Sequence, residues 1–571
     1  MKVAGLLGAL TLTCLLTGCG NESALRDGTF TGTGTGRNGD ITVRITVKNG
    51  VVSDAGIVTQ AETPEFGQRA EEEIFAQFLQ NGSTQGIDVV SGATLTSEGL
   101  LDALDEALAT AHGEESIAEV YEDAECDIVI IGAGGAGLVA ATETASRGAD
   151  VIVLEKTGIV GGNTNSSTGG INAAYTAEQK RLGIKDSTDV FYEDTMRGGM
   201  YQNDPALVRT LVDNSAAIVE WLQSNIVGAD LSDVGIFGGA TNKRIHRPLG
   251  GGAIGRHLVP LLHKAAVMQG ADIRLNNKVI DILSDDGRAS GVLVTTESGD
   301  YLIHAKAVII ATGGFGANPA MVARYNAALE GFATTNHPGA TGDAFALVSK
   351  FDAALTQMEL IQTHPTVVCR TGLMITEAVR GNGAILVNRA GKRFVDELDT
   401  RETVSAAILA EPGGTAFLVF DHGVRNSLQA IETYVQQGLL VEGATPAELA
   451  EKTGINAYAL AETLVRYNGF VRAKNDLDFH RTPESLERQL KTAPFYAVEC
   501  EPAIHHTMGG LKIDTKARVL NTKGEPIPAL FAAGEVTGGI HGAERLGGNA
   551  VADVCIFGKI AADSAADYAG L

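Results

Sequence analysis

The stretch DIVIIGAGGAG, residues 127–137, decides the fold of the larger part of the chain. Its apolar run, Ile128 to Ile131, is typical of a buried parallel strand. The glycine spacing GxGxxG follows, and the next residues predict a helix that ends near Arg147. Residues 151–154 predict a second strand, which runs into Glu155. Strand, glycine-rich turn, helix and second strand with a terminal acid together predict a Rossmann-like unit that binds a dinucleotide.

Each part of this turn has an expected role in holding the dinucleotide. Gly132 makes the tight turn, Gly134 admits the pyrophosphate, and Gly137 permits close packing of the helix on the strand. The helix N-terminus offers unpaired N–H groups to the phosphates, and Glu155 accepts hydrogen bonds from ribose hydroxyls. A glycine turn with a purely structural role is the alternative, which the strand–helix–strand context disfavours.

Glycine-rich segments beyond the second strand indicate a flavin rather than a nicotinamide dinucleotide. Residues 161–164 and 167–170 follow that strand, where a larger cofactor would extend. Near the C-terminus, Gly534-Glu535 and then Gly547-Gly548-Asn549-Ala550 precede a further helix. A helix N-terminus beside the pyrimidine edge of a flavin would stabilise the anionic reduced ring. We therefore expect FAD.

The chain as a whole indicates several domains. Its 571 residues are too many for one compact core. Residues 307–314 and 529–534 repeat the pattern of a strand that runs into glycines, which suggests one α/β domain interrupted by an insertion. The net charge of −25 argues against nucleic acid or anionic lipid as partners, because like charges repel.

The N-terminus has the pattern of a secretory signal. Val3 to Leu16 is apolar but too short for a permanent membrane span. Leu16-Thr17-Gly18-Cys19 resembles the bacterial lipobox, in which the cysteine is acylated and becomes the mature N-terminus. We expect a lipoprotein signal peptide over residues 1–18 and a lipid anchor on Cys19, which would hold an extracytoplasmic protein to a membrane of the cell envelope. An ordinary secretory signal with a chance cysteine is the alternative.

The spacing of the cysteines argues against several metal cofactors. The six cysteines include no CxxC pair and no CxxCH motif, so zinc-ribbon, iron–sulfur and c-type haem sites are not expected. The four that follow Cys19 are widely separated, and we expect them to be buried free thiols.

Residues 25–112 predict a small α+β module. A polar, glycine-rich segment precedes residues 41–47, where apolar and polar side chains alternate as in a strand. Asn49-Gly50 is the turn signal of a tight hairpin. Helices are expected over residues 66–80 and from Ser97 to about Ala111. The acidic residues 113–125 are expected to form a linker.

Beyond this module the chain resembles a known family. The matching stretches are IQTHPT (361–366), MITEAVRGNGAILVNRAGKRFVDE (374–397), TRE (400–402), HHTMGG (505–510) and AAGEVTGGIHGAERLGGNA (532–550). They resemble the flavoprotein part of soluble fumarate reductases of the flavocytochrome c type and their urocanate-reducing relatives. The resemblance implies an α/β fold: a Rossmann-like FAD-binding domain (126–359 and 505–571) with an inserted α+β clamp domain (360–504), which closes over the substrate.

The resemblance also implies the residues of the site. His364 and Thr376 would bind one carboxylate of the substrate, and His505 and Arg545 the other. The expected substrate-binding set is Gly170, His364, Met374, Thr376, Glu377, His505, Arg545 and Gly548. The expected FAD-binding set is Gly132, Gly134, Ala136, Gly137, Glu155, Lys156, Gly162, Asn163, Thr164, Gly169, Gly170, Val279, Asp343, His506, Glu535, Ala550 and Val551.

The resemblance makes Arg401 the proton donor and Glu377 and Arg380 the relay that reprotonates it. A guanidinium normally keeps its proton, so a role of Arg401 as a second anion clamp is the alternative. For the pair His505-His506 a core or metal-binding role is the alternative, disfavoured because acids and cysteines at ligand spacing are lacking.

The full set of donors favours fumarate as the substrate and succinate as the product. A monocarboxylate would leave one group of donors unpaired, which costs binding. Urocanate-reducing relatives replace the histidine of HPT by an aromatic residue, whereas His364 is present here. Urocanate or another enoate stays open, as does an electron-transfer flavolipoprotein without substrate turnover.

The N-terminal module resembles FMN-binding domains of extracytoplasmic redox proteins. Asp88-Val89-Val90-Ser91-Gly92-Ala93-Thr94 matches the motif in which a flavin transferase attaches FMN phosphate to the last threonine. The resemblance thus implies covalent FMN on Thr94. Because the chain cannot bind c-type haem, we expect electrons from a membrane or extracytoplasmic donor to enter through this FMN.

Overall fold

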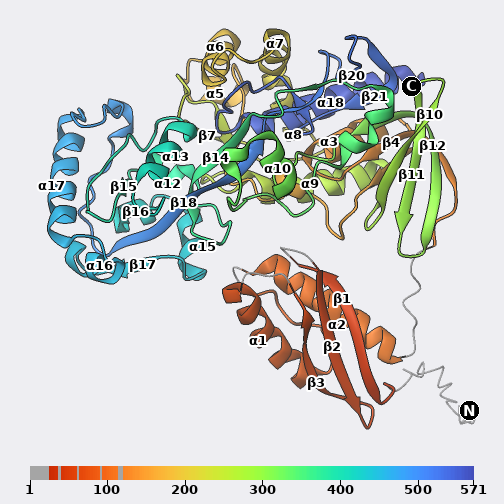
Figure 1. Ribbon diagram of the computed structural model, residues 1–571, viewed down its shortest axis with the longest axis horizontal. Helices are drawn as coiled ribbons and strands as arrows, with labels where there is room; N and C mark the ends of the chain where they lie inside the picture. Colours follow the sequence, from red (N-terminus) through yellow and green to blue (C-terminus); the bar gives the residue numbers. More distant parts are fainter. Residues whose placement is uncertain (1–24, 37–39, 61–63, 91–92, 113–119) are drawn as a thin grey trace, which may run out of the picture.

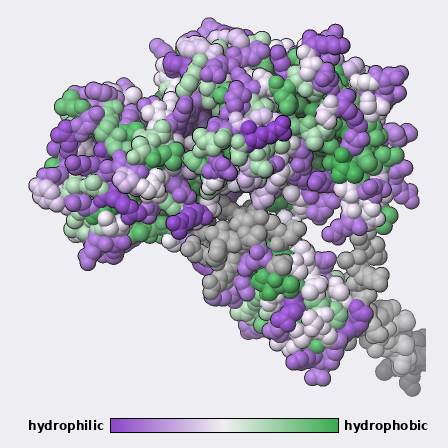
Figure 2. Space-filling model, in the orientation of Figure 1, coloured by the Kyte–Doolittle hydropathy of each residue, from purple (hydrophilic) through white to green (hydrophobic). Residues whose placement is uncertain are grey.

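The computed structural model describes residues 25–36, 40–60, 64–90, 93–112 and 120–571. A small N-terminal domain, drawn in red and orange, lies beside a larger body that is divided between an FAD-binding domain and a clamp domain (Figure 1). Hydrophilic residues cover much of the surface seen in Figure 2, with apolar side chains scattered among them. Within the described residues no helix is long and apolar enough to cross a membrane.

The N-terminal domain packs two helices on a three-stranded antiparallel sheet. Ile41, Val43 and Ile45 are fully buried, as their alternation with polar residues predicts. Asn49 and Gly50 both have positive φ, at 55° and 71°, which is the geometry of a tight hairpin turn. The elements are β1 (Gly28–Thr35), β2 (Asp40–Lys48), β3 (Val51–Thr59), α1 (Pro64–Asn81) and α2 (Thr94–His112).

Strand β1 is formed by the glycine-rich segment for which the sequence predicts no element. A Cβ atom on Gly32 would lie 2.2 Å from the carbonyl oxygen of Ala103, and one on Gly34 would lie 2.2 Å from that of Gly99. These glycines let the backbone of α2 lie directly on β1. The start of α2 is also corrected, from Ser97 to Thr94, because the Ser97 amide already donates to the Ala93 carbonyl at 2.8 Å.

The FAD-binding domain is built on an eight-stranded sheet. Strand β4 lies between β12 and β5 and pairs in parallel with both, so DIVIIGAGGAG forms the predicted strand, turn and helix at the centre. Strand β21 joins the same sheet by pairing in parallel with β12, which confirms one α/β domain interrupted by an insertion. Its main elements are β4 (Ala124–Ile131), α3 (Gly135–Ser146), β5 (Val151–Leu154), α4 (Gly162–Asn165), α9 (Ile254–Gln269), β9 (Asp272–Arg274), β10 (Lys278–Asp285), β11 (Arg288–Thr296), β12 (Gly299–Ile310), β20 (Arg518–Leu520), β21 (Pro526–Ala532) and α18 (Asn549–Ala569).

Smaller elements surround this sheet. Two of them are three-stranded sheets, with the strand orders β6-β8-β7 and β13-β19-β22. The elements are β6 (Ile171–Asn172), α5 (Ala177–Arg181), α6 (Thr188–Gly198), α7 (Pro205–Asp213), α8 (Ser215–Gln223), β7 (Asp233–Gly235), β8 (Ile245–Arg247), α10 (Pro319–Tyr325), η1 (Ala327–Leu329), α11 (Asp343–Leu347), η2 (Ser349–Phe351), β13 (Leu355–Thr356), β19 (Gly510–Lys512) and β22 (Thr537–Gly538).

The clamp domain has its own five-stranded antiparallel sheet and its own hydrophobic core. Its strands β14 and β18 pair with each other and lead back to the FAD-binding domain (Figure 1). The expected boundary at residue 505 falls inside β18. The elements are β14 (Ile361–Val368), α12 (Glu377–Gly381), β15 (Ile385–Val387), α13 (Arg401–Ala410), β16 (Ala416–Asp421), α14 (His422–Arg425), α15 (Ala430–Gln436), β17 (Val441–Gly443), α16 (Pro446–Thr453), α17 (Ala457–Ala473), η3 (Pro483–Ser485) and β18 (Phe495–Thr507).

Candidate active site

The glycine-rich turn after β4 has the geometry that a dinucleotide requires. Gly132 has a φ of 104°, and a Cβ atom there would lie 2.5 Å from the Ala311 carbonyl oxygen. A Cβ atom on Gly137 would lie 1.9 Å from the Gly132 carbonyl oxygen, so this glycine lets α3 pack against the turn. Around Gly134 the nearest atom to an added Cβ is 3.9 Å away, which leaves space for a phosphate to approach the backbone.

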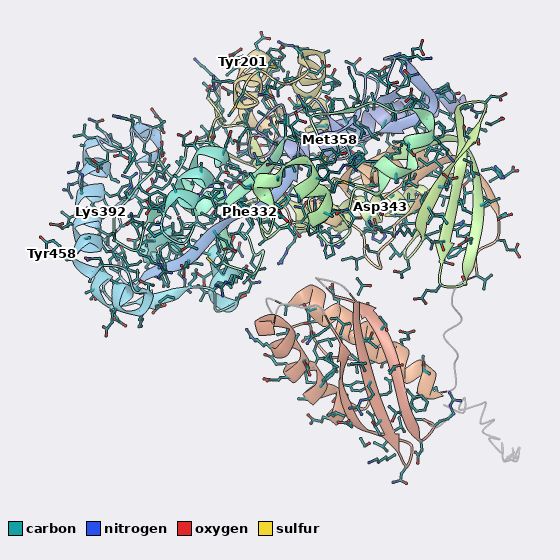
Figure 3. All side chains as sticks on the ribbon, viewed as in Figure 1. Tyr201, Phe332, Asp343, Met358, Lys392 and Tyr458 are labelled. Carbon is teal, nitrogen blue, oxygen red and sulfur yellow. The ribbon has the colours of Figure 1, made fainter. Side chains whose placement is uncertain are left out.

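Most of the residues expected to bind FAD line one cavity beside this turn. Gly137 does not, since it packs behind the turn. Lys156 Nζ lies 2.8 Å from Asp343 Oδ2 in the wall of this cavity, and Figure 3 shows Asp343 within the body of the FAD-binding domain. The expected residues that line the cavity are Gly132, Gly134, Ala136, Glu155, Lys156, Gly162, Asn163, Thr164, Val279, Asp343 and Glu535.

A second cavity, of about 920 Å³, adjoins the first, because Asn163, Thr164 and Glu535 line both. Residues of all three domains contribute to its walls. The further expected residues that line it are Gly169, Gly170, His364, Met374, Thr376, Glu377, Arg401, His505, His506, Arg545, Gly548, Ala550 and Val551. The predicted site residues therefore share one cavity, whereas other residues that line it, including Arg256, Thr335 and Tyr434, carry no motif that would have revealed them.

FAD fits the two cavities, as judged from polar atoms that lack partners. Thr312 Oγ1 at the first cavity and His506 Nδ1 near the second are buried without a hydrogen bond. Glu535 accepts from the Thr507 amide at 2.9 Å and from Asn163 Nδ2 at 3.1 Å, which fixes its carboxylate where the two cavities meet. Burial raises the pKa of Glu535. The unpaired Thr312 hydroxyl and His506 Nδ1 indicate a ligand that completes their hydrogen bonds.

Three histidines of β14 and β18 lie at the second cavity. The rings of His364 and His505 are 5.2 Å apart, and His505 Nδ1 lies 2.8 Å from Thr335 Oγ1. His364 is fully buried and its Nε2 has no partner. Burial and the charge of Arg401 hold the pKa of both imidazoles well below its usual range. The two rings are therefore neutral at neutral pH and can donate or accept according to tautomer.

Arg401, Glu377 and Arg380 form the chain of contacts expected of a proton relay. Arg401 Nη2 lies 3.0 Å from Glu377 Oε2, and Arg401 Nε donates to the same oxygen at 3.1 Å. Arg380 Nη2 lies 3.9 Å from that oxygen, and Arg380 is not among the residues that line the cavity. Burial would raise the pKa of Glu377, but the charges of Arg401 and Arg380 outweigh it and lower the pKa. Glu377 is thus an ionised carboxylate between two guanidinium groups.

Gln362 joins Arg401 and Arg545, which both line the cavity, and it was not among the predicted site residues. Its Oε1 accepts from Arg401 Nη1 at 3.1 Å and from Arg545 Nη2 at 3.0 Å. Arg545 is buried, and burial together with the Arg401 charge lowers its pKa to about 9. Gln362 lies within the quoted motif IQTHPT, but only the folded arrangement reveals that its amide contacts both guanidinium groups.

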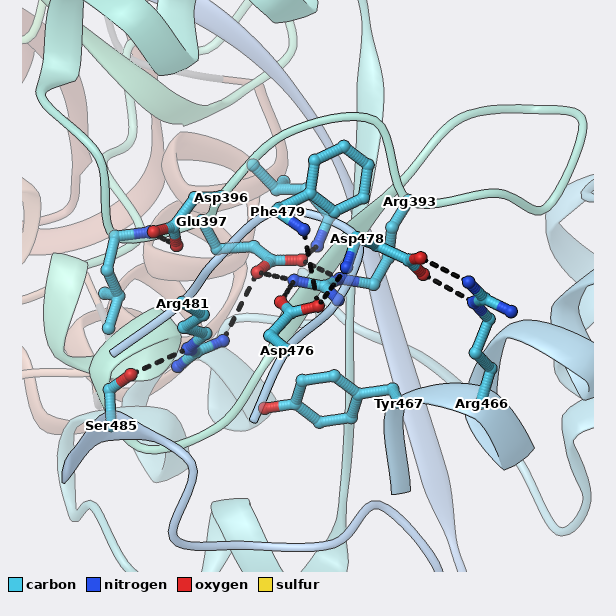
Figure 4. Close-up of polar contacts among 12 residues, drawn as sticks. Arg393, Asp396, Glu397, Arg466, Tyr467, Asp476, Asp478, Phe479, Arg481 and Ser485 are labelled. Atoms are coloured by element: carbon cyan, nitrogen blue, oxygen red, sulfur yellow. Dashed lines mark hydrogen bonds and ion pairs between the residues drawn. The ribbon is translucent and has the colours of Figure 1, made fainter. Parts of the chain in front are cut away.

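A buried ionic network contacts Arg380, the last residue of the expected relay. Figure 4 shows the ion pairs of this network. Arg393 pairs with Glu397 at 2.7 Å and with Asp476 at 2.9 Å, and Arg481 pairs with Glu397 at 3.3 Å. Arg481 Nη2 also donates to the Arg380 carbonyl at 2.6 Å. Arg380 Nη1 in turn donates to the Glu397 carbonyl at 2.5 Å. The network thus fixes both the backbone and the side chain of Arg380.

The N-terminal domain contacts the clamp beside this cavity. Leu373, a clamp residue that is 5% exposed, belongs to the hydrophobic core of the N-terminal domain. Arg69 Nη1 of α1 donates to the Gln436 carbonyl at 3.0 Å. Ala93, Thr96 and Glu98, at the start of α2, line the cavity itself. Ser91 and Gly92 lie outside the described residues, as do Cys19 and the Thr94 side chain, so FMN attachment and lipidation stay predictions.

The remaining cysteines and histidines add no metal site within the described residues. No group of three or more histidine, cysteine or acidic side chains there could hold a metal ion. Cys126, Cys500 and Cys555 are buried free thiols as predicted, while Cys369 is only partly buried.

Comparisons with known proteins agree with this geometry. Residues 127–551 match the FAD binding domain family, and residues 36–109 match the FMN-binding domain family. The chain is 48% identical to a fumarate reductase (cytochrome) of Shewanella frigidimarina, over 77% of each chain. It is 40% identical to an NADH:fumarate oxidoreductase of Klebsiella pneumoniae, over 96% of this chain and 59% of that protein. The open conformation of a flavocytochrome c3 fumarate reductase matches with a TM-score of 0.67 and 42% identity, covering 78% of this chain and 79% of the other.

Fold, cavities and family matches define an FAD-dependent oxidoreductase with a separate FMN-binding domain. Within that class the chain belongs to the family of flavocytochrome c-type fumarate reductase flavoproteins. The expected fold class and both flavin cofactors are thereby confirmed.

Proposed function

We propose that this enzyme reduces fumarate to succinate in the second cavity. The observation that carries the proposal is that Arg401, already joined to Glu377, lines the same cavity as Arg545, His364, His505 and Thr376. These groups can hold two carboxylates. A site whose buried donors match both ends of a ligand discriminates against one that pairs only half of them.

Each side chain has a proposed task in catalysis. Reduced FAD, when bound, supplies a hydride to one alkene carbon of the substrate. Negative charge then develops on the other carbon and its carboxylate, and Arg545 and His505 are placed to stabilise it. His364 and Thr376 hold the opposite carboxylate, Gly170 and Gly548 add backbone contacts, and Met374 restricts the space around the substrate.

Arg401 is the proposed proton donor to the second carbon. A guanidinium is a very weak acid, but a carbanion-like carbon is a far stronger base than a neutral guanidine, so the transfer runs downhill. Once Arg401 is neutral, the Glu377 carboxylate faces one cation fewer and its pKa rises. Glu377 then takes a proton from the Arg380 side and passes it to Arg401.

Electrons are proposed to reach FAD from FMN esterified to Thr94 by a flavin transferase. The support is that residues on both sides of Thr94, Ala93 and Thr96, line the cavity that also holds the expected flavin-binding residues. A phosphodiester at the start of α2 would also be stabilised by the helix N-terminus. The chain therefore has a site for electron entry that uses no haem.

FMN attachment is tested by flavin fluorescence of the denatured protein in a gel. We expect fluorescence from the wild type and none from Thr94→Ala, because a covalent flavin survives denaturation. Thr96→Ala, two residues along the same helix, is the matched control and should stay fluorescent. Fluorescence retained in Thr94→Ala would place the flavin elsewhere.

The protein is further proposed to be an extracytoplasmic lipoprotein anchored through Cys19, with its donor in or beside the membrane. The support is the signal pattern of residues 1–18 and the lipobox-like residues before Cys19. Membrane association and acyl labelling that persist in Cys19→Ser would contradict this.

Two other functions have some support. Urocanate or another enoate could occupy the same cavity, although a single carboxylate leaves part of the donor set unpaired. An electron-transfer role without turnover would need both flavins but no substrate. Oxidation of a reduced dye on addition of fumarate distinguishes the electron-transfer role from catalysis. A protein that carries both flavins and shows no fumarate-dependent oxidation is not a fumarate reductase.

A further inference from the structure

Glu544 is a buried carboxylate next to the substrate site that the proposed reaction leaves without a task. It is 4% exposed, and within the part of the chain that the structure describes it has no ion pair. Its Oε1 accepts from Gln362 Nε2 at 2.9 Å, and its Oε2 accepts from the backbone amide of Glu402 at 3.1 Å. A buried carboxylate is costly unless hydrogen bonds or an ion pair compensate it, and both of the hydrogen bonds that compensate Glu544 lead towards Arg401.

The first bond orients the amide of Gln362. Its Nε2 donates to Glu544 and to the Arg545 carbonyl, both at 2.9 Å, so both amide hydrogens have acceptors. Its Oε1 is therefore directed at the guanidinium groups of Arg401 and Arg545. With the amide turned over, the NH₂ group would face two guanidinium groups that can only donate. When it is ionised, Glu544 can only accept hydrogen bonds. It therefore selects the orientation of the Gln362 amide in which Oε1 holds Arg401.

The second bond fixes the backbone from which Arg401 projects. Arg401 is the first residue of α13, and Glu402 is the second. The Thr400 hydroxyl accepts from the Thr403 amide, whereas Glu544 satisfies the Glu402 amide. Amides in the first turn of a helix have no partner within the helix, and a carboxylate stabilises that end. Glu544 thus restrains both the backbone and, through Gln362, the side chain of the proposed proton donor.

We propose that Glu544 is a positioning residue that holds the Arg401 guanidinium in the geometry required for proton donation. The inference rests on the proposed fumarate reduction. Arg401 contacts Glu377 on one side and Gln362 on the other, so loss of the Gln362 contact leaves the guanidinium free to turn about its bonds to Glu377. Small displacements of a reacting group cost large factors in rate.

The test compares Glu544→Gln and Glu544→Ala with the wild-type holoenzyme. Glutamine keeps the shape but turns an NH₂ group towards one of the two donors, so one hydrogen bond is lost. We expect kcat for fumarate to fall about tenfold or more in both variants. The inhibition constant of succinate should change less than about threefold, because Arg545 keeps its own bond to the Leu546 carbonyl at 3.2 Å and the histidines are untouched.

Two further measurements separate positioning from a general loss of structure. The solvent deuterium isotope effect on kcat should rise in Glu544→Gln, because proton donation becomes slower relative to the other steps. In a double-mutant cycle, Glu544→Gln should cost less in a Gln362→Met background, since part of its effect passes through Gln362. The flavin absorption spectrum and melting temperature show whether each variant is folded.

Glu402→Gln is the matched control. It removes a carboxylate one residue from Arg401, but the Glu402 side chain is exposed and Glu544 bonds only its backbone amide. We expect its kcat to stay within about twofold of wild type, since exposed charges act weakly. An active wild type with a folded Glu544→Gln variant of unchanged kcat and isotope effect would overturn the inference. A wild type without fumarate turnover would instead overturn the proposed function.

Discussion

Arg401 combines two requirements at the scale of one residue. As the proposed proton donor it must lie at the substrate cavity, and it must regain a proton after each turnover without exposure of the substrate to water. Its contacts with Glu377 and Gln362 meet the first requirement, and Arg380 behind Glu377 meets the second. An anion clamp alone would not need an ionised carboxylate and a second buried guanidinium in line behind it.

Replacing Arg401 by alanine should abolish turnover and leave FAD in place. We expect kcat to fall at least about a hundredfold, because both the proton donor and a positive charge are lost. Flavin content is read from the absorption spectrum and turnover from dye oxidation by fumarate. Arg466→Ala, an exposed arginine of the clamp paired with Asp478, is the control and should be fully active. Substantial residual activity in Arg401→Ala would place the acid elsewhere.

The neutral histidines of the second cavity predict a pH dependence of ligand binding. Burial and the Arg401 charge lower the pKa of His364 and His505. A bound dianion offsets the arginine charges and raises both pKa values, so the complex binds protons that the free protein does not. Affinity for succinate should therefore rise as the pH falls through the pKa of the complex, and should be lost as the pH rises above it.

Titration calorimetry of succinate in two buffers of different ionisation enthalpy measures this proton uptake directly. We expect net uptake at pH 6, where succinate carboxylates outside the protein are already largely ionised, and less uptake at pH 8. His364→Gln should reduce the uptake. A dissociation constant that is independent of pH, with no uptake, would contradict the proposed protonation of these histidines.

Part of the polar lining of the site could be predicted, because those residues lie in stretches with a recognisable order of residue types. His364, His505 and Arg545 come from such stretches and meet at one cavity. Gln362 and Glu544 could not be assigned a role from the same stretches. Their importance depends on hydrogen bonds between strand β14 and the loop before α18, and sequence spacing does not report such contacts.

At the scale of elements, the turn between β4 and α3 determines whether FAD binds. Gly137→Ala should abolish FAD binding, because a Cβ atom there would lie 1.9 Å from the Gly132 carbonyl oxygen and must displace the turn or the helix. The protein should be purified with FMN alone, as measured by flavin analysis after denaturation. FAD bound to Gly137→Ala at wild-type stoichiometry would show that the turn is more tolerant than its geometry indicates.

Gly469→Ala in α17 is the matched control for that substitution. Gly469 lies within a helix, and among the described residues the only side-chain atom within 4 Å of an added Cβ is Nη2 of Arg472, 3.9 Å away. Alanine should therefore keep FAD and stabilise the helix by about 0.5–1 kcal/mol.

Elements with strong local patterns were predictable, and those determined by neighbours were not. The apolar runs of β4 and β5 and the Asn49-Gly50 turn can be recognised from the sequence alone. Strand β1 does not, since Gly32 and Gly34 have poor strand propensity and are required only because α2 lies on them. The same holds for the start of α2, which depends on the Ala93 carbonyl rather than on a capping hydroxyl.

At the scale of the whole molecule, the N-terminal domain, which is the proposed entry point of electrons, lies against the clamp domain. Leu373 anchors it to the clamp, and the next residue, Met374, lines the substrate cavity. Leu373→Asp should release the domain, because a charged group would be buried in its hydrophobic core. We expect a larger radius of gyration by small-angle X-ray scattering, with both flavins still bound.

Leu477→Asp is the control for that release. Leu477 is also on the clamp but is 66% exposed, so the same substitution there should leave the scattering unchanged. Identical scattering from Leu373→Asp and the wild type would mean that Leu373 does not hold the N-terminal domain.

The central claim is that the cavity between the FAD-binding and clamp domains takes a 1,2-dicarboxylate. It is tested most directly by turnover of the flavin-loaded wild type with fumarate, urocanate and acrylate side by side, with a reduced dye as electron donor. The account predicts that kcat/KM is highest for fumarate, by at least about tenfold, because only fumarate pairs the donors at both ends of the cavity. A urocanate or acrylate value above that for fumarate would contradict it.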